Sequence, residues 1–469
     1  MSKQGKRNMR RFVWFFIILC IPTWGQVMHV EGGGNYTSAT RMPYFIITNQ
    51  GGLYGKIQNG GFARINVSSS ARPIDLSSWA FDYGIDGIGR FGGNIKEVEL
   101  YQAFAGMQYK FIQLWAGKRQ EFYGNQDTLL SSGGAVWSGN APPIPKVMLS
   151  TAGFVPLFPW DWIRISTGIA HGWMGYKESY IENPFLHQKY FYIRLGDPRK
   201  ISFTAGIQHY AQWGGISPKY GQLPNDFKNF VKVFFAYNNE DKLDPLNSDM
   251  PENEARNRIG NHVGTKDFGF DFCYRGWAVK LYWQNFIEDI TGMGFRNAMD
   301  GIWGISIGQS SQWRLNYEFI HTYTYYVPFE ERLALDDYFN NSVYRSGWTY
   351  KGYVIGTPLI TSPVLLADTL IGRKLTNNRA IAHHAAAGYT IGRLSLILQY
   401  IYSRNYGNSE VILTLNSPMI QHNIALQANM NEIFPHLSLK TTIAYDKGAL
   451  LGNRWGFHLS LNYRVEKLF

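Results

Sequence analysis

The segment Ile201–Gln212 reads ISFTAGIQHYAQ, and this stretch decides the fold class. Its odd positions, beginning with Ile201 and Phe203, are mostly apolar, whereas its even positions carry Ser, Thr, Gly, Gln and Tyr. Successive side chains of a β-strand point to opposite faces, so a period of two indicates a strand with one apolar and one polar face. The segment is also longer than the about 5–6 residues that are usual for strands of globular proteins.

The same alternation recurs along most of the chain, in runs of about 9–11 residues, the length that crosses a bilayer at a tilt. A closed barrel is the β architecture that leaves no unpaired backbone groups in lipid. We therefore predict an all-β protein, a transmembrane antiparallel β-barrel of the outer-membrane type, with its apolar faces toward lipid. Aromatic strand ends that fit the girdles at the lipid–water boundaries are Trp277, Trp283, Trp313 and Tyr402.

The C-terminal segment carries a second barrel signature. Trp455, Leu459 and Leu461 share one face of a predicted strand, and the chain ends at Phe469. This order resembles the last-strand signal that outer-membrane barrels present to the barrel assembly machinery. At about 25 residues for each strand with its connection, the chain suffices for roughly 16–18 strands. No domain boundary or internal repeat is visible, so we expect a single barrel domain over residues 26–469.

The N-terminus predicts export. Only 17% of the 469 residues are charged while 16% are aromatic, and the apolar block Phe12–Ile21 is too short to span a membrane as a helix. A basic stretch precedes this block and Gly25 follows it, which is the pattern of a secretory signal peptide over residues 1–25. Lipoprotein processing at Cys20 fits less well, because the bulky Leu19 precedes it.

Charge and cysteine content exclude further classes. The formal net charge is +11, but much of the excess lies in the predicted signal peptide, so we expect no nucleic-acid partner. Cys273 is the one cysteine of residues 26–469, which excludes an intramolecular disulfide and a Cys-based zinc site. The cations of the signal peptide are Lys3, Lys6, Arg7, Arg10 and Arg11.

Two catalytic motifs occur in the wrong context. Gly87, Gly89 and Gly92 spell the dinucleotide fingerprint, but that motif requires a helix after it, and here a strand follows. Ser306 stands in a G-x-S-x-G pattern within an alternating segment, so we predict a strand residue that faces the lumen.

No metal site is predicted. His383 and His384 are adjacent, so in a strand they face opposite sides and cannot hold one metal together. The acidic loop from Glu240 to Glu254 offers oxygen ligands, but its spacing differs from that of an EF-hand, and we interpret it as a solvated loop. We expect neither a metal nor another cofactor.

One segment breaks the β pattern. Pro224 is followed by Asn225 or Asp226 as a candidate N-cap, and apolar residues then recur at helical spacing. We expect one short amphipathic helix that lies against the barrel in a packed, structural role, which we favour over a functional lid. Its apolar residues are Phe227, Phe230, Val231 and Phe234.

The segment His321–Tyr353 is rich in tyrosine and carries acidic residues and Arg345. Sugars expose apolar C–H faces and hydroxyl groups, so aromatic rings beside hydrogen-bonding side chains suit a glycan. Loop packing together with an aromatic girdle explains the same composition, and at this point both interpretations stay open.

An ordered set of motifs resembles the Wzi family of capsule-assembly outer-membrane proteins. The resemblance covers roughly residues 95–360, and its specificity lies in the order of the motifs rather than in any one of them. The motifs are Trp115–Lys118, Phe122–Gly124, Leu130–Gly133, Ser138–Pro145, Gln212–Gly215, Gly269–Phe272 with Phe286–Asp289, and Tyr350–Tyr353 with Gly356.

The resemblance implies an 18-stranded outer-membrane barrel that acts as a lectin, attaches capsular polysaccharide to the cell surface and is not an enzyme. Enterobacterial members of the family carry an N-terminal helical bundle that plugs the barrel from the periplasm. This chain departs from that pattern, because Gln26–Arg41 is glycine-rich and the following Met42–Thr48 is strand-like. Since extracellular loops vary most, the glycan can differ as well.

The motif Asn140–Pro145 contains three prolines, which remove donors from a strand ladder, so it predicts a stiff loop in or over the lumen. Lys118, Arg119, Glu121 and Asn140 would then be polar groups in a confined place. They either close the pore by pairing with one another or contact sugar, and we favour pairing because buried charges need partners.

We therefore expect a lectin-like protein of the bacterial outer membrane, with polysaccharide, membrane lipids and the barrel assembly machinery as partners. The alternatives are a porin-like channel for small solutes and, less favoured, an outer-membrane hydrolase. The predicted polysaccharide-binding residues are Trp137, Trp213, Tyr220, Tyr325, Tyr344 and Trp348.

Overall fold

The computed structural model describes residues 26–69, 79–92, 95–237, 258–288, 297–309, 312–323, 337–366, 373–409 and 417–467. The predicted signal peptide, the acidic loop from Glu240 to Glu254 and the candidate residue Tyr325 lie outside these ranges.

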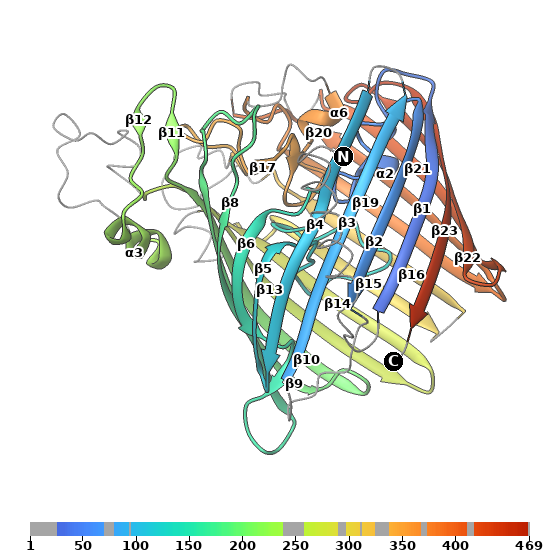
Figure 1. The fold of residues 1–469 in the computed structure, drawn as a ribbon, viewed down its shortest axis with the longest axis horizontal. Coiled ribbons are helices and arrows are strands. Elements are labelled where there is room, and N and C mark those ends of the chain that lie inside the picture. The colour runs from blue at the N-terminus through green and yellow to red at the C-terminus, as the bar shows by residue number, and fades with distance from the viewer. Residues whose placement is uncertain are drawn as a thin grey trace, which may run out of the picture.

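Long antiparallel strands make up the wall of the molecule (Figure 1). They are β1 (Gln26–Thr37), β2 (Gly60–Ser69), β3 (Trp79–Gly92), β4 (Ile95–Tyr109), β5 (Ile112–Lys118), β6 (Pro145–Thr151), β8 (Ile163–Trp173), β9 (Phe185–Asp197), β10 (Ile201–Trp213), β13 (Asn261–Tyr274), β14 (Trp277–Ile287), β15 (Gly301–Gln309), β16 (Trp313–His321), β19 (Ala380–Ile391), β20 (Leu394–Asn405), β21 (Met419–Phe434), β22 (Leu437–Gly448) and β23 (Arg454–Lys467).

These strands form a closed barrel of 18 strands, as the sequence predicted. Each wall strand pairs with the next one along the chain, and β23 pairs with β1, with Gln26 opposite Lys467. The two-residue strand β7 (Val155–Pro156) pairs with β8 beyond the end of β6 and so continues the same wall position. Closure pairs both edges of the sheet, which is what a barrel in lipid requires.

The two ends of the barrel differ. Short turns join β4 to β5, β13 to β14 and β19 to β20 at one end, where β1 begins and β23 ends (Figure 1). The turn at Arg275 and Gly276 has positive φ at both residues, the geometry of a tight hairpin turn. The long connections leave the opposite end. In barrels of this architecture short turns face the periplasm and long loops face outward, so we assign the long-loop end to the extracellular side.

The predicted alternation is confirmed on both faces of the wall. Ile201 and Phe203 of β10 are exposed on the outside, whereas Ser202 and Thr204, which alternate with them, are buried toward the lumen. In the last strand Trp455 is exposed and faces outward in the same way. An apolar exterior around a polar interior is the reverse of a soluble protein, and it suits a lipid surround.

The predicted amphipathic helix is α3 (Phe227–Phe235). Its N-cap is Asp226, whose carboxylate accepts the backbone N–H of Asn229 at 2.9 Å. This hydrogen bond holds the pKa of the Asp226 carboxyl below its ordinary value. The helix lies against the outer face of the barrel, where Val233 packs with Ala211 and Trp213 of β10 (Figure 1).

Replacing the cap should loosen this helix without opening the barrel. We expect Asp226→Ala to destabilise α3 by about 1 kcal/mol, because one backbone donor of the first turn loses its acceptor. Hydrogen exchange of the α3 amides should become faster while exchange in β10 stays unchanged. Unchanged exchange in α3 would contradict this role of Asp226, and Asp226→Asn, which keeps a capping oxygen, serves as the control.

Two single-turn helices were not predicted, α2 (Tyr44–Ile47) and α6 (Pro363–Leu366). The strand-like interpretation of Met42–Thr48 was therefore wrong. Met42, Ile46 and Ile47 are buried in the lumen, where the apolar run packs on other inward segments instead of joining the sheet. Within the described ranges, no helix has both the length and the hydropathy that a membrane span needs.

Two small hairpins complete the fold, β11 (Ile216–Ser217) with β12 (Gly221–Gln222), and β17 (Thr349–Tyr350) with β18 (Tyr353–Val354). Both belong to connections at the extracellular end. The β11–β12 hairpin projects beyond the wall, whereas β17 and β18 consist of buried residues.

Candidate functional site

The connection between β5 and β6, residues 119–144, folds into the lumen, and we call it the inner loop. Its proline-rich part forms no strand and lies in the lumen, as predicted, and Asn140 within it is completely buried. The Asn140 side chain donates to the backbone oxygen of Val354 at 2.8 Å and accepts the backbone N–H of Asn49 at 3.1 Å. One asparagine thus ties together three connections that are far apart in the sequence.

Carboxylates of the barrel wall hold the inner loop in place. Asp267 of β13 accepts both the backbone N–H and the side-chain amide of Asn125, at 3.1 and 2.9 Å. Glu318 of β16 accepts the backbone N–H of Ser132 at 2.7 Å. Hydrogen bonds to charged groups are among the stronger ones, and these satisfy loop amides that would otherwise be buried without partners.

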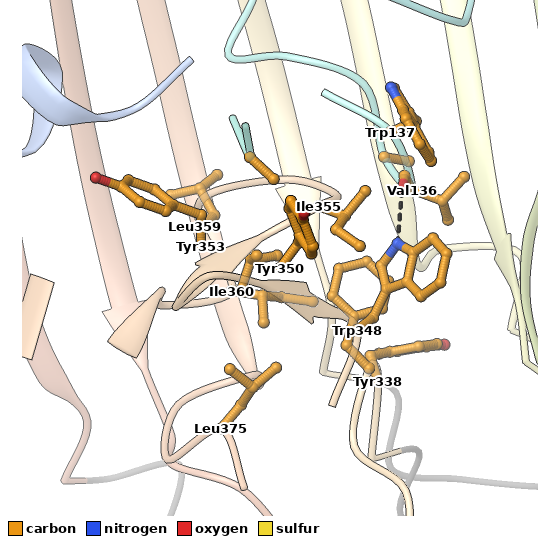
Figure 2. Packing of buried hydrophobic residues seen from close by; sticks show 14 of the residues in the cluster. Val136, Trp137, Tyr338, Trp348, Tyr350, Tyr353, Ile355, Leu359, Ile360 and Leu375 are labelled. Atoms are coloured by element: carbon orange, nitrogen blue, oxygen red, sulfur yellow. Dashed lines mark hydrogen bonds between the residues drawn. The ribbon is translucent and has the colours of Figure 1, made fainter. Parts of the chain in front are cut away.

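An apolar cluster then fills the lumen from wall to wall. It reaches Leu186 of β9 on one side and Ala444 of β22, about half-way round the barrel, on the other. At its centre Trp348 is 0% exposed, and its indole N–H donates to the backbone oxygen of Val136 at 2.8 Å (Figure 2). Trp137 stacks on Tyr210 of β10 with ring centroids 5.2 Å apart. The inner loop and residues 337–366 therefore form one plug, which we call the lumen plug.

The polar residues of the family motif are all partnered, but not with one another, so the predicted mutual pairing was wrong. Lys118 donates to the backbone oxygen of Leu100 at 2.9 Å, and Arg119 pairs with Asp82 at 2.8 Å. These partners belong to the strands β4 and β3 of the wall. Glu121 forms an ion pair with Lys146, and Asn140 bonds to the plug as described above.

The motifs that suggested catalysis have structural roles. Ser306 faces the lumen as predicted, and its hydroxyl donates to Asp127 at 2.7 Å, which fastens the inner loop. His384 faces the lumen and pairs with Glu318 at 2.8 Å, whereas His383 faces outward beside Tyr317. Among the described residues, no group of three or more His, Cys, Asp or Glu side chains is arranged to hold a metal ion.

The structure places the predicted polysaccharide-binding residues in two environments. Trp348 is 0%, Trp213 and Tyr344 are 3%, and Trp137 is 7% exposed, so their rings are occupied by protein packing. Tyr220 is 36% exposed in the β11–β12 hairpin at the extracellular end. In the described conformation, Tyr220 is thus the member of the described set that offers a ring face to a ligand.

Three extracellular connections meet around Tyr220, and we call them the three-loop platform: residues 174–184, 214–226 and 337–348. The backbone N–H of Tyr180 donates to Ser346 at 3.1 Å, and the Tyr344 hydroxyl donates to the backbone oxygen of Gly214 at 3.2 Å. Ile181, Leu223 and Tyr344 pack beneath as one buried cluster. The platform is therefore a supported surface and not a set of independent loops.

Cationic and aromatic groups alternate on the platform. The Lys219 ammonium lies 4.7 Å from the ring centroid of Tyr220, and the exposed Arg345 guanidinium lies 5.8 Å from that of Tyr180. Tyr180 and Lys219 were not among the residues predicted to bind polysaccharide. Their signal was weak, since each is a single residue in a connection, and only the contacts between the loops bring them together.

Comparison with known proteins adds a family and a fold. The family model described as capsule assembly protein Wzi matches residues 29–360. A search of curated protein sequences found no significant match.

Among solved structures, the chain is similar to a barrel described as Wzi, an outer membrane protein involved in group 1 capsule assembly in Escherichia coli and a carbohydrate-binding β-barrel. Sequence identity is 14%, coverage is 94% of this chain and 84% of that one, and the TM-score is 0.61. Acinetobacter baumannii OccAB2 aligns over 94% and 98% of the two chains at 7% identity, with a TM-score of 0.48. Pseudomonas aeruginosa OprD aligns over 95% and 96% at 10% identity, with a TM-score of 0.47.

Proposed function

Because this chain belongs to the Wzi family of capsule assembly proteins and is an outer-membrane β-barrel, we propose that it attaches an extracellular or capsular polysaccharide to the cell surface. Binding in this proposal is noncovalent and uses the three-loop platform. Many copies in the membrane would engage one repeating polymer, so that weak single contacts add up to firm retention.

The exposed face of Tyr220 carries the proposal. The ring stands on a hairpin that is fixed by the Glu182–Ile216 bridge and by the contacts of the platform, so little side-chain entropy is lost on binding. Lys219 and Arg345 beside it supply hydrogen-bond donors for sugar hydroxyls or carboxylates. Tyr344, which is buried below, would support the surface without touching the sugar, whereas Trp213 packs against α3.

We propose that the protein does not catalyse a reaction on the polymer. Ser306 is engaged by Asp127, and the His384–Glu318 pair is enclosed in the plug with both side chains 0% exposed. A hydrolytic site needs such groups within reach of substrate. The cluster that spans the lumen likewise argues against a porin-like channel, since a porin keeps a water-filled passage.

Deleting the gene in its native host tests the function. We expect polymer synthesis to continue while the cell-bound fraction falls and the released fraction rises, because the anchor is missing. Cell-bound and released polysaccharide are quantified by uronic acid or hexose assay after mild washing. Unchanged retention would refute the anchor and make a bilayer conductance measurement the next step.

Tyr220→Ala tests the site. Stacking of an aromatic ring contributes about 0.5–1.5 kcal/mol, so we expect the affinity of the purified protein for its own organism's polymer to fall by about two- to tenfold. Isothermal titration or surface plasmon resonance measures the change. Tyr274→Ala removes an exposed tyrosine at the periplasmic end and is the matched control. Equal affinity of both variants would remove Tyr220 from the site.

A further inference from the structure

The outer wall of the barrel carries a groove that the polysaccharide proposal does not use. It has a volume of about 800 Å³ and runs over β5 to β10 on the lipid-facing side. Apolar side chains dominate its lining, among them Leu149, Ile169, Phe191 and Ile207, with the small Thr167 between them. Such a narrow apolar depression suits one hydrocarbon chain.

One end of the groove is polar and lies beneath α3. Lys189 and His209 are neighbours across the β9–β10 ladder, and both line this end together with Phe234 of the helix. The Lys189 ammonium donates to the backbone oxygen of Phe234 and lies 4.4 Å from the centroid of its ring. Within the described part of the chain, no carboxylate forms an ion pair with Lys189.

Further buried nitrogens surround this polar end. Neither ring nitrogen of His187, which is completely buried, has a hydrogen-bond partner among the described residues, and the same holds for Nδ1 of His209. A cation at membrane depth is costly unless an anion or acceptor faces it. Because an imidazole ring carries at least one N–H, His187 has a donor that the described residues leave unused.

The groove runs from the extracellular half of the wall to the periplasmic turns. Lys189 lies toward the extracellular end of β9, and the apolar part extends toward Phe111 and Leu157 near the periplasmic turns. On α3, Phe227 and Phe235 are 79% and 67% exposed and have no protein cover, as in helices that lie in a membrane interface. A lipid of the outer leaflet would therefore place its headgroup at α3 and its chain along the wall.

We propose that this groove binds one acyl chain of a phosphorylated glycolipid of the outer leaflet, with its phosphate at Lys189 beneath α3. The phosphate supplies an anion for the Lys189 ammonium. The acyl chain covers the apolar lining of the groove, which would otherwise contact exchanging bulk lipids. The helix then acts as a clamp over the headgroup, held by the same lysine.

Native mass spectrometry of the full barrel in mild detergent tests the proposal with lipid A and phosphatidylcholine as probes. We expect one lipid A to stay bound and phosphatidylcholine to be lost. Lys189→Glu should reduce the bound fraction of lipid A by about five- to tenfold through charge reversal, and Thr167→Phe should do so by filling the groove.

Two outward-facing residues of β22 give matched controls, Lys447→Glu and Thr441→Phe. Thr441 also resembles Thr167 in that its hydroxyl donates to a backbone oxygen. Both controls should bind lipid A as the unchanged protein does, and heat-modified gel mobility confirms that each barrel is folded. If Lys189→Glu disturbs α3, the Thr167→Phe variant decides whether the groove binds lipid A, because it leaves Lys189 in place. Equal binding by all variants, or equal retention of phosphatidylcholine, would overturn the proposal.

Discussion

Removing both inward segments of the lumen plug should convert this closed barrel into a conducting channel. The change replaces residues 122–141 and 338–362 with short Gly-Ser linkers, and the expected result is discrete, steady current steps in planar bilayers where the unchanged protein shows none. The reason is geometric, because barrels of 16–18 strands leave an aqueous channel unless something fills it. Here the inward side chains of the wall pack on connections between strands, and those connections provide the filling.

Deleting the inner loop alone should give a smaller or unsteady current, since residues 337–366 remain anchored to Asn377 and the wall. The control is removal of Ser217–Gln222, which shortens the exposed β11–β12 hairpin and leaves the cluster that spans the lumen intact. A steady current through the unchanged protein would contradict the plug, and so would the same current after every deletion.

Trp348→Ala should cause the largest loss of stability of any single substitution considered for this chain. Truncating a fully buried tryptophan typically lowers the free energy of unfolding by about 3–5 kcal/mol, because a cavity replaces the ring. The Trp348 ring lies against both Trp137 and Tyr210, with centroids 6.5 and 5.7 Å away, and its indole N–H donates to the Val136 oxygen, so the loss extends to a hydrogen bond (Figure 2). Urea unfolding of the protein in lipid vesicles measures the difference.

Trp348→Phe separates the two contributions. It keeps most of the apolar volume but leaves the Val136 oxygen without its donor, so we expect a loss of about 1–3 kcal/mol. Trp160→Ala changes an exposed tryptophan near the periplasmic turns, and its effect should stay within about 0.5 kcal/mol. If Trp348→Ala unfolds at the same urea concentration as Trp160→Ala, the plug contributes nothing to stability.

The amino-acid sequence alone was sufficient to predict the barrel. The alternation of ISFTAGIQHYAQ over residues 201–212 sets which side chains face lipid, since a shift of one residue would exchange the two faces of the strand. The same local rule placed Trp455 outside and Ser306 inside. Helical spacing after Asp226 was likewise sufficient for α3, because capping and amphipathicity are properties of a few neighbouring residues.

Local pattern failed where partners come from distant parts of the chain. Met42–Thr48 reads as a strand, yet no open strand edge exists in a closed barrel, so the segment turns into a helix and is buried in the lumen. The four polar residues of the family motif were expected to pair with one another, but Glu121 pairs with Lys146 and Arg119 with Asp82 once the wall is formed. In the sequence, Trp348 and Tyr220 look equally suited to stack on a sugar. In the structure they differ, because Trp348 is buried and Tyr220 is exposed.

Periodicity and turn residues therefore dictated the wall, its two faces and its closure, because those depend on contacts between neighbouring strands. Closure of the lumen, the three-loop platform and the lipid groove depend on which connections meet after the barrel has formed. Many contacts of the lumen plug join residues more than 100 positions apart, as in the bonds from Asn140 to Val354 and from Asp267 to Asn125. No spacing along the chain encodes such distances, so only the packed tertiary structure could select them.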